Sequence, residues 1–224
     1  LLLFVGLAGP QARASHLIGG EMTYSYLGAL GPSNAPFRYR VTVLIYVNAG
    51  STSSVPDGRP TIAVNFYNKS QNGALIRSVN MPRISNPLIV PPGCTSAGSP
   101  VQVRLCRYET TVDLPVSFDG YYATYTDGTR NLGITNLRTP SDTQQQTIYM
   151  EMAPPLLPNA SPTFSDTAVV IVCQNDTTLI LNNAVDPNGD RLVYTLVTPY
   201  DRLANVNQFT PPPIPVTYPN GYGP

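Results

Sequence analysis

Residues 37–47 have the sequence FRYRVTVLIYV, and this stretch decides the fold class of the chain. Apolar side chains stand at every second position, namely Phe37, Tyr39, Val41, Val43, Ile45 and Val47. The positions between them include Arg38, Arg40 and Thr42. Successive side chains of an extended strand point to opposite faces of a sheet. The alternation therefore predicts a β-strand with one buried face and one largely wet face.

Strand patterns bounded by turn residues continue on both sides of this stretch. Residues 21–27 predict a partner strand, and residues 61–67 and 74–79 predict a hairpin around Asn72-Gly73. The five prolines of residues 82–100 predict a long surface loop. Further strands are expected at residues 101–105, 108–114, 121–125 and 146–152. Short strands with regularly spaced turns predict an all-β fold, with a β-sandwich at residues 15–153.

A second module is predicted beyond a proline-rich linker at residues 154–162, which has the sequence PPLLPNASP. Its strands are expected at residues 168–173, 177–181 and 191–197. The architecture is then a tandem of immunoglobulin-like or cadherin-like β-sandwich modules. A complete sandwich needs about seven strands, so residues 163–224 are expected to be a truncated module of a longer protein.

The first residues carry the features of an export signal. The apolar run of residues 1–8 is followed by Gly9-Pro10 and by Ala12-Arg13-Ala14, an A-x-A cleavage site. Residues 1–14 therefore predict a partial secretory signal peptide, a mature chain that starts at Ser15, and an extracellular or cell-surface location. No stretch approaches the ~20 apolar residues that span a bilayer, so no transmembrane segment is expected.

The composition narrows the class of partner. Lys+Arg and Asp+Glu both number 13, so the formal net charge is zero. Without a basic surface to neutralise phosphates, nucleic acid is not expected as a partner. Charged residues make up only 12% of the chain, which has 24 Pro, 14 Tyr and no Trp. Low charge with many Pro, Thr, Val and Tyr residues indicates an extracellular β protein.

Three cysteines are present. Cys94 and Cys106 stand close enough in sequence to close a short disulfide loop in an oxidising compartment. Cys173 lies in the apolar run AVVIVC and is expected to be a buried, inert thiol. The spacings fit no zinc pattern.

Residues 186–190, DPNGD, present oxygen-bearing side chains at every second position. Asp186, Asn188 and Asp190 suit Ca²⁺, a hard cation that takes 6 to 8 oxygen ligands. Further oxygens would come from Asp166, Asp176 or Glu151, from carbonyl groups and from water. The alternative is a tight turn without metal, because Asp, Pro, Asn and Gly are also turn residues.

Catalytic patterns are weak, and no enzyme activity is expected. His16 is the only histidine, which argues against a zinc site and against a Ser-His-Asp triad. The carboxylates are scattered through strand and turn patterns. The densest aromatic group is a hypothesis for glycan contact, with core packing as the alternative; it consists of Tyr121, Tyr122 and Tyr125.

Several blocks of sequence, in order along the chain, resemble one family. They are SHLIGGEMTYSYLG, FRYRVTVLIYV, RYETTVDLP, DGYYATYTDGTRNLGITNL, SPTFSDTAVVIVCQNDTTLILNNAVDPNGDRLVYTLVTPY and PPPIPVTYPNGY. The chain is similar over nearly all of residues 15–223 to the N-terminal region of Bacteroidetes secreted surface proteins described as gliding-motility-associated or PKD-domain-containing. Cysteines that are common in that family near Tyr26, Asn48 and Thr129 are missing here.

The resemblance implies a function and a route of export. It implies type IX secretion and a non-catalytic adhesion module, in some relatives linked to gliding, with surface glycans or other proteins as partners. The alternatives are a carbohydrate-binding module of a larger enzyme and a filament or stalk subunit with homotypic assembly. The DPNGD turn resembles cadherin-like repeats, some of which bind Ca²⁺. Thr167 and Thr177 lie in tripeptides that look like the family's O-glycosylation sites.

Overall fold

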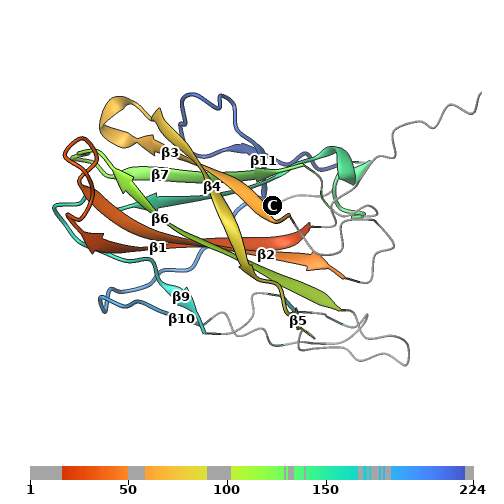
Figure 1. The fold of residues 1–224 in the computed structure, drawn as a ribbon. Coiled ribbons are helices and arrows are strands. Elements are labelled where there is room, and N and C mark those ends of the chain that lie inside the picture. The colour runs from red at the N-terminus through yellow and green to blue at the C-terminus, as the bar shows by residue number, and fades with distance from the viewer. Residues whose placement is uncertain are drawn as a thin grey trace, which may run out of the picture.

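The computed structural model describes residues 17–49, 59–89, 102–128, 130, 134–138, 140–165, 169–170, 172, 177, 179 and 183–219. In these ranges the chain consists of β-strands, loops and two short 3-10 helices, which confirms the all-β prediction (Figure 1). None of the helices in them is long and apolar enough to cross a membrane.

The strands differ greatly in length. Those of seven to twelve residues are β1 (Leu17–Gly28), β2 (Phe37–Asn48), β3 (Thr61–Asn68), β4 (Ala74–Ser85), β6 (Val103–Leu114), β7 (Tyr121–Asp127) and β8 (Gln146–Met152). The short ones are β5 (Leu88–Ile89), β9 (Thr163–Phe164), β10 (Ala184–Val185), β11 (Tyr200–Arg202) and β12 (Ile214–Pro215). The 3-10 helices are η1 (Lys69–Gln71) and η2 (Ser141–Thr143).

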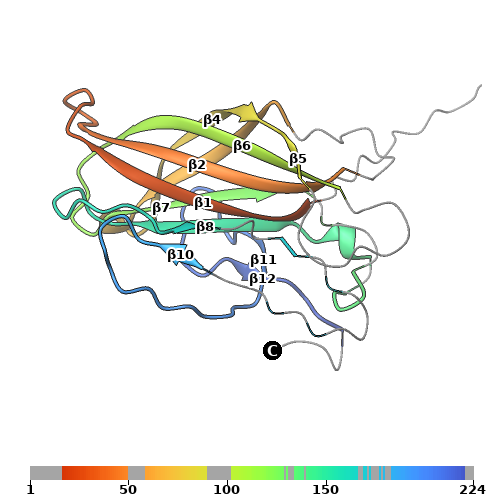
Figure 2. The same cartoon turned by 90° about the horizontal axis from the view of Figure 1, so that it is seen from below.

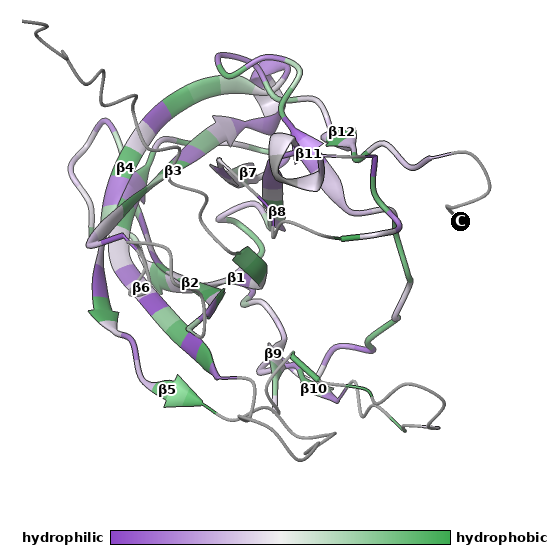
Figure 3. Cartoon of the chain, turned by 90° about the vertical axis from the view of Figure 1, so that its right-hand side faces the viewer, coloured by the Kyte–Doolittle hydropathy of each residue, from purple (hydrophilic) through white to green (hydrophobic). Residues whose placement is uncertain are grey.

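One antiparallel sheet holds all but two of these strands, in the order β1-β2-β6-β4-β3-β7-β8-β11-β12, with β5 also paired to β6. The sheet curls until β1 contacts β8, as the view along the strands shows (Figure 3). Its two halves therefore face each other as in a sandwich and enclose the main apolar core. Strands β9 and β10 form a separate small ribbon.

Strand β2 explains why the halves pack together. Tyr39, Val41 and Val43 are at most 1% exposed and lie in the core. On the other face Arg38 pairs with Asp113 of the neighbouring strand β6, at 2.7 Å between Nε and Oδ1. The predicted alternation of a buried and a wet face is therefore present in the structure.

Strand β4 belongs to both halves of the sheet. Its residues 74–82 pair with β3, and residues 83–85 pair with β6. The prediction of a loop from residue 82 is therefore wrong for residues 82–85 and for β5. The change of partner falls at Pro82, and a proline without an N–H group is tolerated where a ladder ends.

The predicted hairpin between residues 61–67 and 74–79 is confirmed as β3 and β4. Asn72 and Gly73 both have positive φ, at 55° and 68°. A Cβ atom on Gly73 would lie 1.9 Å from the carbonyl oxygen of Phe209. Glycine is therefore required here both by the turn and by a segment from the far end of the chain.

The C-terminal part differs from the prediction. Residues 191–197, expected to form a strand, contain none, and the expected strands at 168–173 and 177–181 lie largely outside the described residues. Strand β11 instead pairs with β8, and β12 pairs with β11 (Figure 2). Residues on both sides of the 154–162 linker thus contribute to one sheet, while the division into two modules stays a prediction.

Candidate functional site

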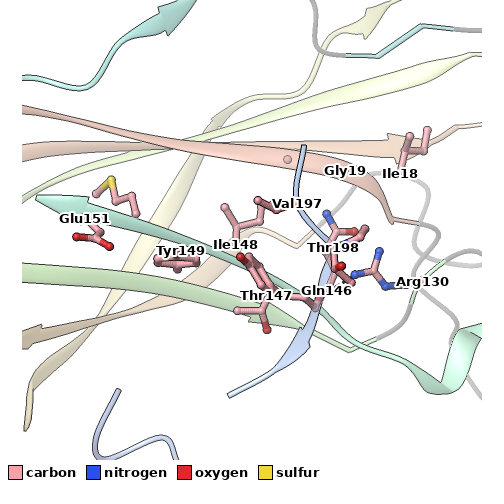
Figure 4. A pocket seen from close by; sticks show the side chains of 14 residues that line it. Ile18, Gly19, Arg130, Gln146, Thr147, Ile148, Tyr149, Glu151, Val197 and Thr198 are labelled. Atoms are coloured by element: carbon pink, nitrogen blue, oxygen red, sulfur yellow. Dashed lines mark hydrogen bonds between the residues drawn. The ribbon is translucent and has the colours of Figure 1, made fainter. Parts of the chain in front are cut away.

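A groove of about 610 Å³ lies between the edge strand β1 and strand β8 (Figure 4). Residues 18–20 form one wall, residues 146–151 form another, and residues 197–200 lie across it together with Arg130. The side-chain oxygen Oε1 of Gln146 is buried here without a hydrogen-bond partner in the described structure. The groove therefore lies where the curled sheet brings β1 next to β8.

Of two neighbouring glycines in β1, only Gly20 determines how closely β1 approaches β8. A Cβ atom on Gly20 would lie 2.6 Å from Cδ1 of Ile148 and 2.6 Å from the carbonyl oxygen of Leu44. A Cβ atom on Gly19 would meet nothing within 4 Å. Gly20 therefore allows the strands to come together, while Gly19 faces open space.

Arg130 forms hydrogen bonds to two chain segments that meet at one end of the groove. It is 8% exposed, and its guanidinium donates from Nε to the Gln145 carbonyl at 3.0 Å and from Nη2 to the Tyr200 carbonyl at 2.8 Å. Burial lowers the pKa of Arg130, and the carboxylate of Asp201 opposes that shift. One buried side chain thus joins the residue before β8 to the first residue of β11.

Two further buried polar residues fasten the same region. The carboxylate of Asp201 accepts the Gln145 N–H at 2.6 Å, and the Thr147 hydroxyl donates to the Asp201 carbonyl at 2.8 Å. The amide of Gln144 accepts the Thr217 N–H at 2.7 Å and donates to the Thr217 carbonyl at 3.1 Å. Residues 200–217 are therefore anchored on the strands that precede the linker.

The outer face of strands β3, β7 and β8 is covered by Phe209, which is 3% exposed. Its ring centroid lies 5.2 Å from that of Tyr122, 5.5 Å from that of Tyr149 and 5.6 Å from that of Tyr67. This cover buries aromatic residues that would otherwise face solvent.

The aromatic hypothesis for glycan contact needs correction. Tyr121 and Tyr125 are 0% and 4% exposed and belong to the core, where no sugar ring reaches them. Burial raises the pKa of Tyr121 to about 12. Tyr122 points to the opposite face, under Phe209, with the Lys69 ammonium 4.7 Å from its ring centroid. The three side chains therefore do not form one surface.

The DPNGD turn is well ordered by its own hydrogen bonds. Oδ1 of Asp186 accepts the N–H groups of Asn188 at 2.8 Å and Asp190 at 3.1 Å. The Asp186 carbonyl accepts the Gly189 N–H at 3.2 Å, and Gly189 has a φ of 80°. The side chains that suit a cation also serve as turn residues.

The turn contacts the linker. Oδ1 of Asn188 accepts the Ala160 N–H at 2.9 Å, and Nδ2 of Asn159 donates to Oδ2 of Asp190 at 3.4 Å. Ala160 in turn forms a bridge with Ser25 of β1. The turn, the linker and the edge of β1 therefore form one connected junction.

The junction also holds Tyr24 of β1. Ala153 donates its N–H to the Tyr24 hydroxyl at 3.0 Å, and the Tyr24 carbonyl accepts the Ser161 N–H at 2.9 Å. Burial raises the pKa of Tyr24, and the negative charge of Asp186 adds to the rise. Both ends of the linker are thus tied to one strand.

The Ca²⁺ hypothesis stays a prediction. Among the described residues no group of three or more His, Cys, Asp or Glu side chains is placed to hold a metal. Glu151, one expected additional ligand, instead accepts a 2.7 Å ion pair from Lys69. Asp166 and Asp176 lie outside the described residues. Ligands beyond the turn itself would come from Asp166, Asp176, carbonyl groups or water.

The remaining predicted sites are only partly described. Cys106 is buried in β6 opposite Ile45, while Cys94 lies outside the described residues, so the disulfide stays a prediction. Cys173, His16 and Thr167 also lie outside them, and Thr177 is exposed.

Sequence reasoning missed Arg130, Gln144, Asp201 and Phe209. The first two stand in polar stretches that predict loops, and the partners of all four are distant in sequence. No local pattern marks them.

Comparison of the chain with models of known families, with curated proteins and with solved structures gave no match.

Proposed function

We propose that the chain is a non-catalytic module of an extracellular surface protein and that its role is adhesion. The proposal is supported by the resemblance to Bacteroidetes surface proteins, by the export pattern of residues 1–14 and by the all-β fold. Type IX secretion and a link to gliding belong to the same proposal.

The observation that carries the proposal is the junction between β1, the linker and the DPNGD turn. Tyr24 is hydrogen-bonded to Ala153 and to Ser161, and Ala160 is hydrogen-bonded to Asn188. A proline-rich linker that is fastened along a strand resists swivelling more than a free one. Such a connection suits a module that transmits force between a cell and a surface.

The proposal includes Ca²⁺ bound at the DPNGD turn. Asp186, Asn188 and Asp190 lie in the turn that contacts the linker, so a cation held by their oxygens would stiffen the junction. The ion would neutralise the carboxylates of Asp186 and Asp190, which belong to the same turn.

An adhesion assay tests the proposed function. Beads coated with the folded chain are passed under shear over bare glass, over a panel of glycans and over beads that carry the same chain. Retention above that of albumin-coated beads on at least one surface is expected. Equal retention on every surface would contradict the proposal.

The same assay separates the ligands. Retention on a glycan surface that the same glycan in solution abolishes would identify a glycan ligand. Retention only on beads carrying the same chain would identify homotypic assembly as the mode of adhesion.

A further inference from the structure

We propose that the groove between β1 and β8 is an acceptor site for a β-strand and that its occupant is the chain's own segment 195–199. The segment lies beside the groove in this structure and is poised to close it. The inference is independent of the proposed adhesion function.

Residues 192–197, which overlap the segment, have the composition of a strand but leave large apolar side chains in solvent. In residues 192–197 the apolar and β-branched residues Leu192, Val193, Tyr194, Thr195, Leu196 and Val197 follow one another. Leu196 is 99% exposed, Val193 is 79% exposed and Val197 is 63% exposed. Large exposed apolar groups in a row indicate a segment that is buried in another arrangement.

One existing residue pair already fixes the register in which the segment would pair with β8. Tyr200 pairs with Thr147 in an antiparallel ladder, which in the described structure is the single pair between β11 and β8. Extension of that ladder places Thr198 opposite Tyr149 and Leu196 opposite Glu151. Thr198, Tyr149 and Glu151 line the groove, and Leu196 directly precedes the lining residues 197–200. The groove is thus the space between two chain segments that would continue one ladder.

The backbone of β8 is oriented for this ladder. The N–H of Gln145 donates to the Asp201 carboxylate, and the N–H of Ala153 donates to the Tyr24 hydroxyl, both away from β7. Alternate residues of a strand direct their N–H and C=O groups to the same side. Tyr149 and Glu151 therefore direct theirs into the groove.

Pro199 does not obstruct closure. Its carbonyl accepts the N–H of Val216 at 2.9 Å, so residue 199 faces β12 rather than β8. The N–H group that proline lacks is then not needed by the new ladder, whose hydrogen bonds are made by Thr198 and Leu196.

In the closed arrangement, the side chains of Leu196 and Val197 would lie next to apolar or aromatic neighbours. Tyr149 and Tyr200, which lie on the outer face, already stack with ring centroids 5.6 Å apart. Leu196 would join that face, and Val197 would lie opposite Met150, which is 8% exposed and part of the core. Closure would change β8 from a nearly free edge into an interior strand.

An engineered disulfide tests the register. Leu196→Cys with Glu151→Cys places two thiols opposite each other in the closed arrangement, within the 4.4–6.8 Å between Cα atoms that a disulfide spans. Val193→Cys with Glu151→Cys is the matched control, displaced by three residues. All three positions are on the surface. We expect the first pair to oxidise at least ~10-fold faster, to an intramolecular bond located by mass mapping.

Each other outcome overturns the inference. Equal oxidation rates, or no cross-link in the first pair, would show that the segment does not occupy the groove in this register. A cross-linked dimer would assign the groove to the segment of a second copy. Hydrogen exchange in the unmodified chain gives an independent check. Slow exchange of the Tyr149 and Glu151 amides is expected, and fast exchange of both would contradict closure.

Discussion

The guanidinium of Arg130 donates a 2.8 Å hydrogen bond to the carbonyl oxygen of Tyr200, which lies 70 residues later in the chain. Through the same side chain, the Gln145 carbonyl accepts a second bond at 3.0 Å. The contact holds the first residue of β11 beside the start of β8, at the groove that Arg130 and Tyr200 both line.

Arg130→Met is expected to lower the free energy of unfolding by about 2–3 kcal/mol, because two acceptors of a charged donor lose their partner in a buried site. Urea denaturation measures the change. Arg202→Met is the control, since Arg202 is 59% exposed in its pair with Asp201, and should cost less than about 1 kcal/mol. Equal effects of the two substitutions would contradict the role given to Arg130.

Gly20→Ala is expected to destabilise the protein by about 1–3 kcal/mol, because the added methyl group would collide with Ile148 and with the Leu44 backbone. Gly19→Ala, one residue away and facing open space, should change stability by about 0.5 kcal/mol or less. Thermal or urea denaturation of the pair checks this. A harmless Gly20→Ala would show that β1 does not approach β8 as closely as the structure has it.

Phe209→Ala is expected to cost about 3–5 kcal/mol, since the ring is buried against Tyr67, Tyr122 and Tyr149. Near-ultraviolet circular dichroism should report the loss of aromatic packing together with the lower denaturation midpoint. Phe118→Ala is the matched control, because Phe118 is 73% exposed and should be nearly neutral. A neutral Phe209→Ala would show that residues 206–209 do not cover the sheet.

Millimolar Ca²⁺ is expected to raise the melting temperature. A dissociation constant of ~10⁻⁴ M at ~1 mM free ion corresponds to roughly 1.4 kcal/mol. Excess chelator should reverse the shift. Asp186→Asn keeps an oxygen for the two N–H groups of the turn but removes the charge, and it should abolish the response. Asp119→Asn is the control, and an unchanged melting curve in the unmodified chain would end the Ca²⁺ hypothesis.

The Glu21 carboxyl gives stability a dependence on pH. Burial raises its pKa above 4.5, and the hydrogen bond from the Tyr46 hydroxyl opposes the rise. The folded state therefore holds this proton more tightly than the unfolded state does. The stability it contributes is complete below pH 4.5 and is lost as the pH rises through the raised pKa.

Glu21→Gln should remove that loss, which denaturation at a series of pH values would show as a flatter profile above pH 4.5. Asp113→Asn is the contrasting variant. The Arg38 guanidinium lowers the pKa of Asp113, so its contribution is present above pH 3.8 and is lost below it. A Glu21→Gln profile that parallels the unmodified protein above pH 4.5 would contradict the assignment.

Local chemistry made part of this fold predictable. The alternation of residues 37–47 and the Asn72-Gly73 turn are properties of neighbouring residues, and both were present in the structure as expected. Residues 146–152 were likewise predicted as a strand and form β8. Strand periodicity and positive φ do not depend on the rest of the chain.

Other features depend on distant segments. In β7 the residues of both faces include apolar side chains, because Tyr121 enters the core while Tyr122 lies under Phe209. A sequence window cannot show that a residue 87 positions later covers the second face. Residues 191–197 have the strand pattern without a strand partner in the described structure, since pairing depends on an edge that the segment itself cannot supply.

The curled sheet brings together residues that are far apart in the sequence. Phe37 pairs with Leu114, and Thr147 pairs with Tyr200, so several of its ladders join strands that are distant in sequence. Chains dominated by such distant pairs fold in milliseconds to seconds rather than microseconds, because a long loop must close before each contact forms. Gln144 is hydrogen-bonded to Thr217, so a nascent chain that ends before residue 217 lacks the bonds that hold this segment on the sheet. The chain is therefore expected to reach full kinetic resistance to unfolding only after this segment has docked.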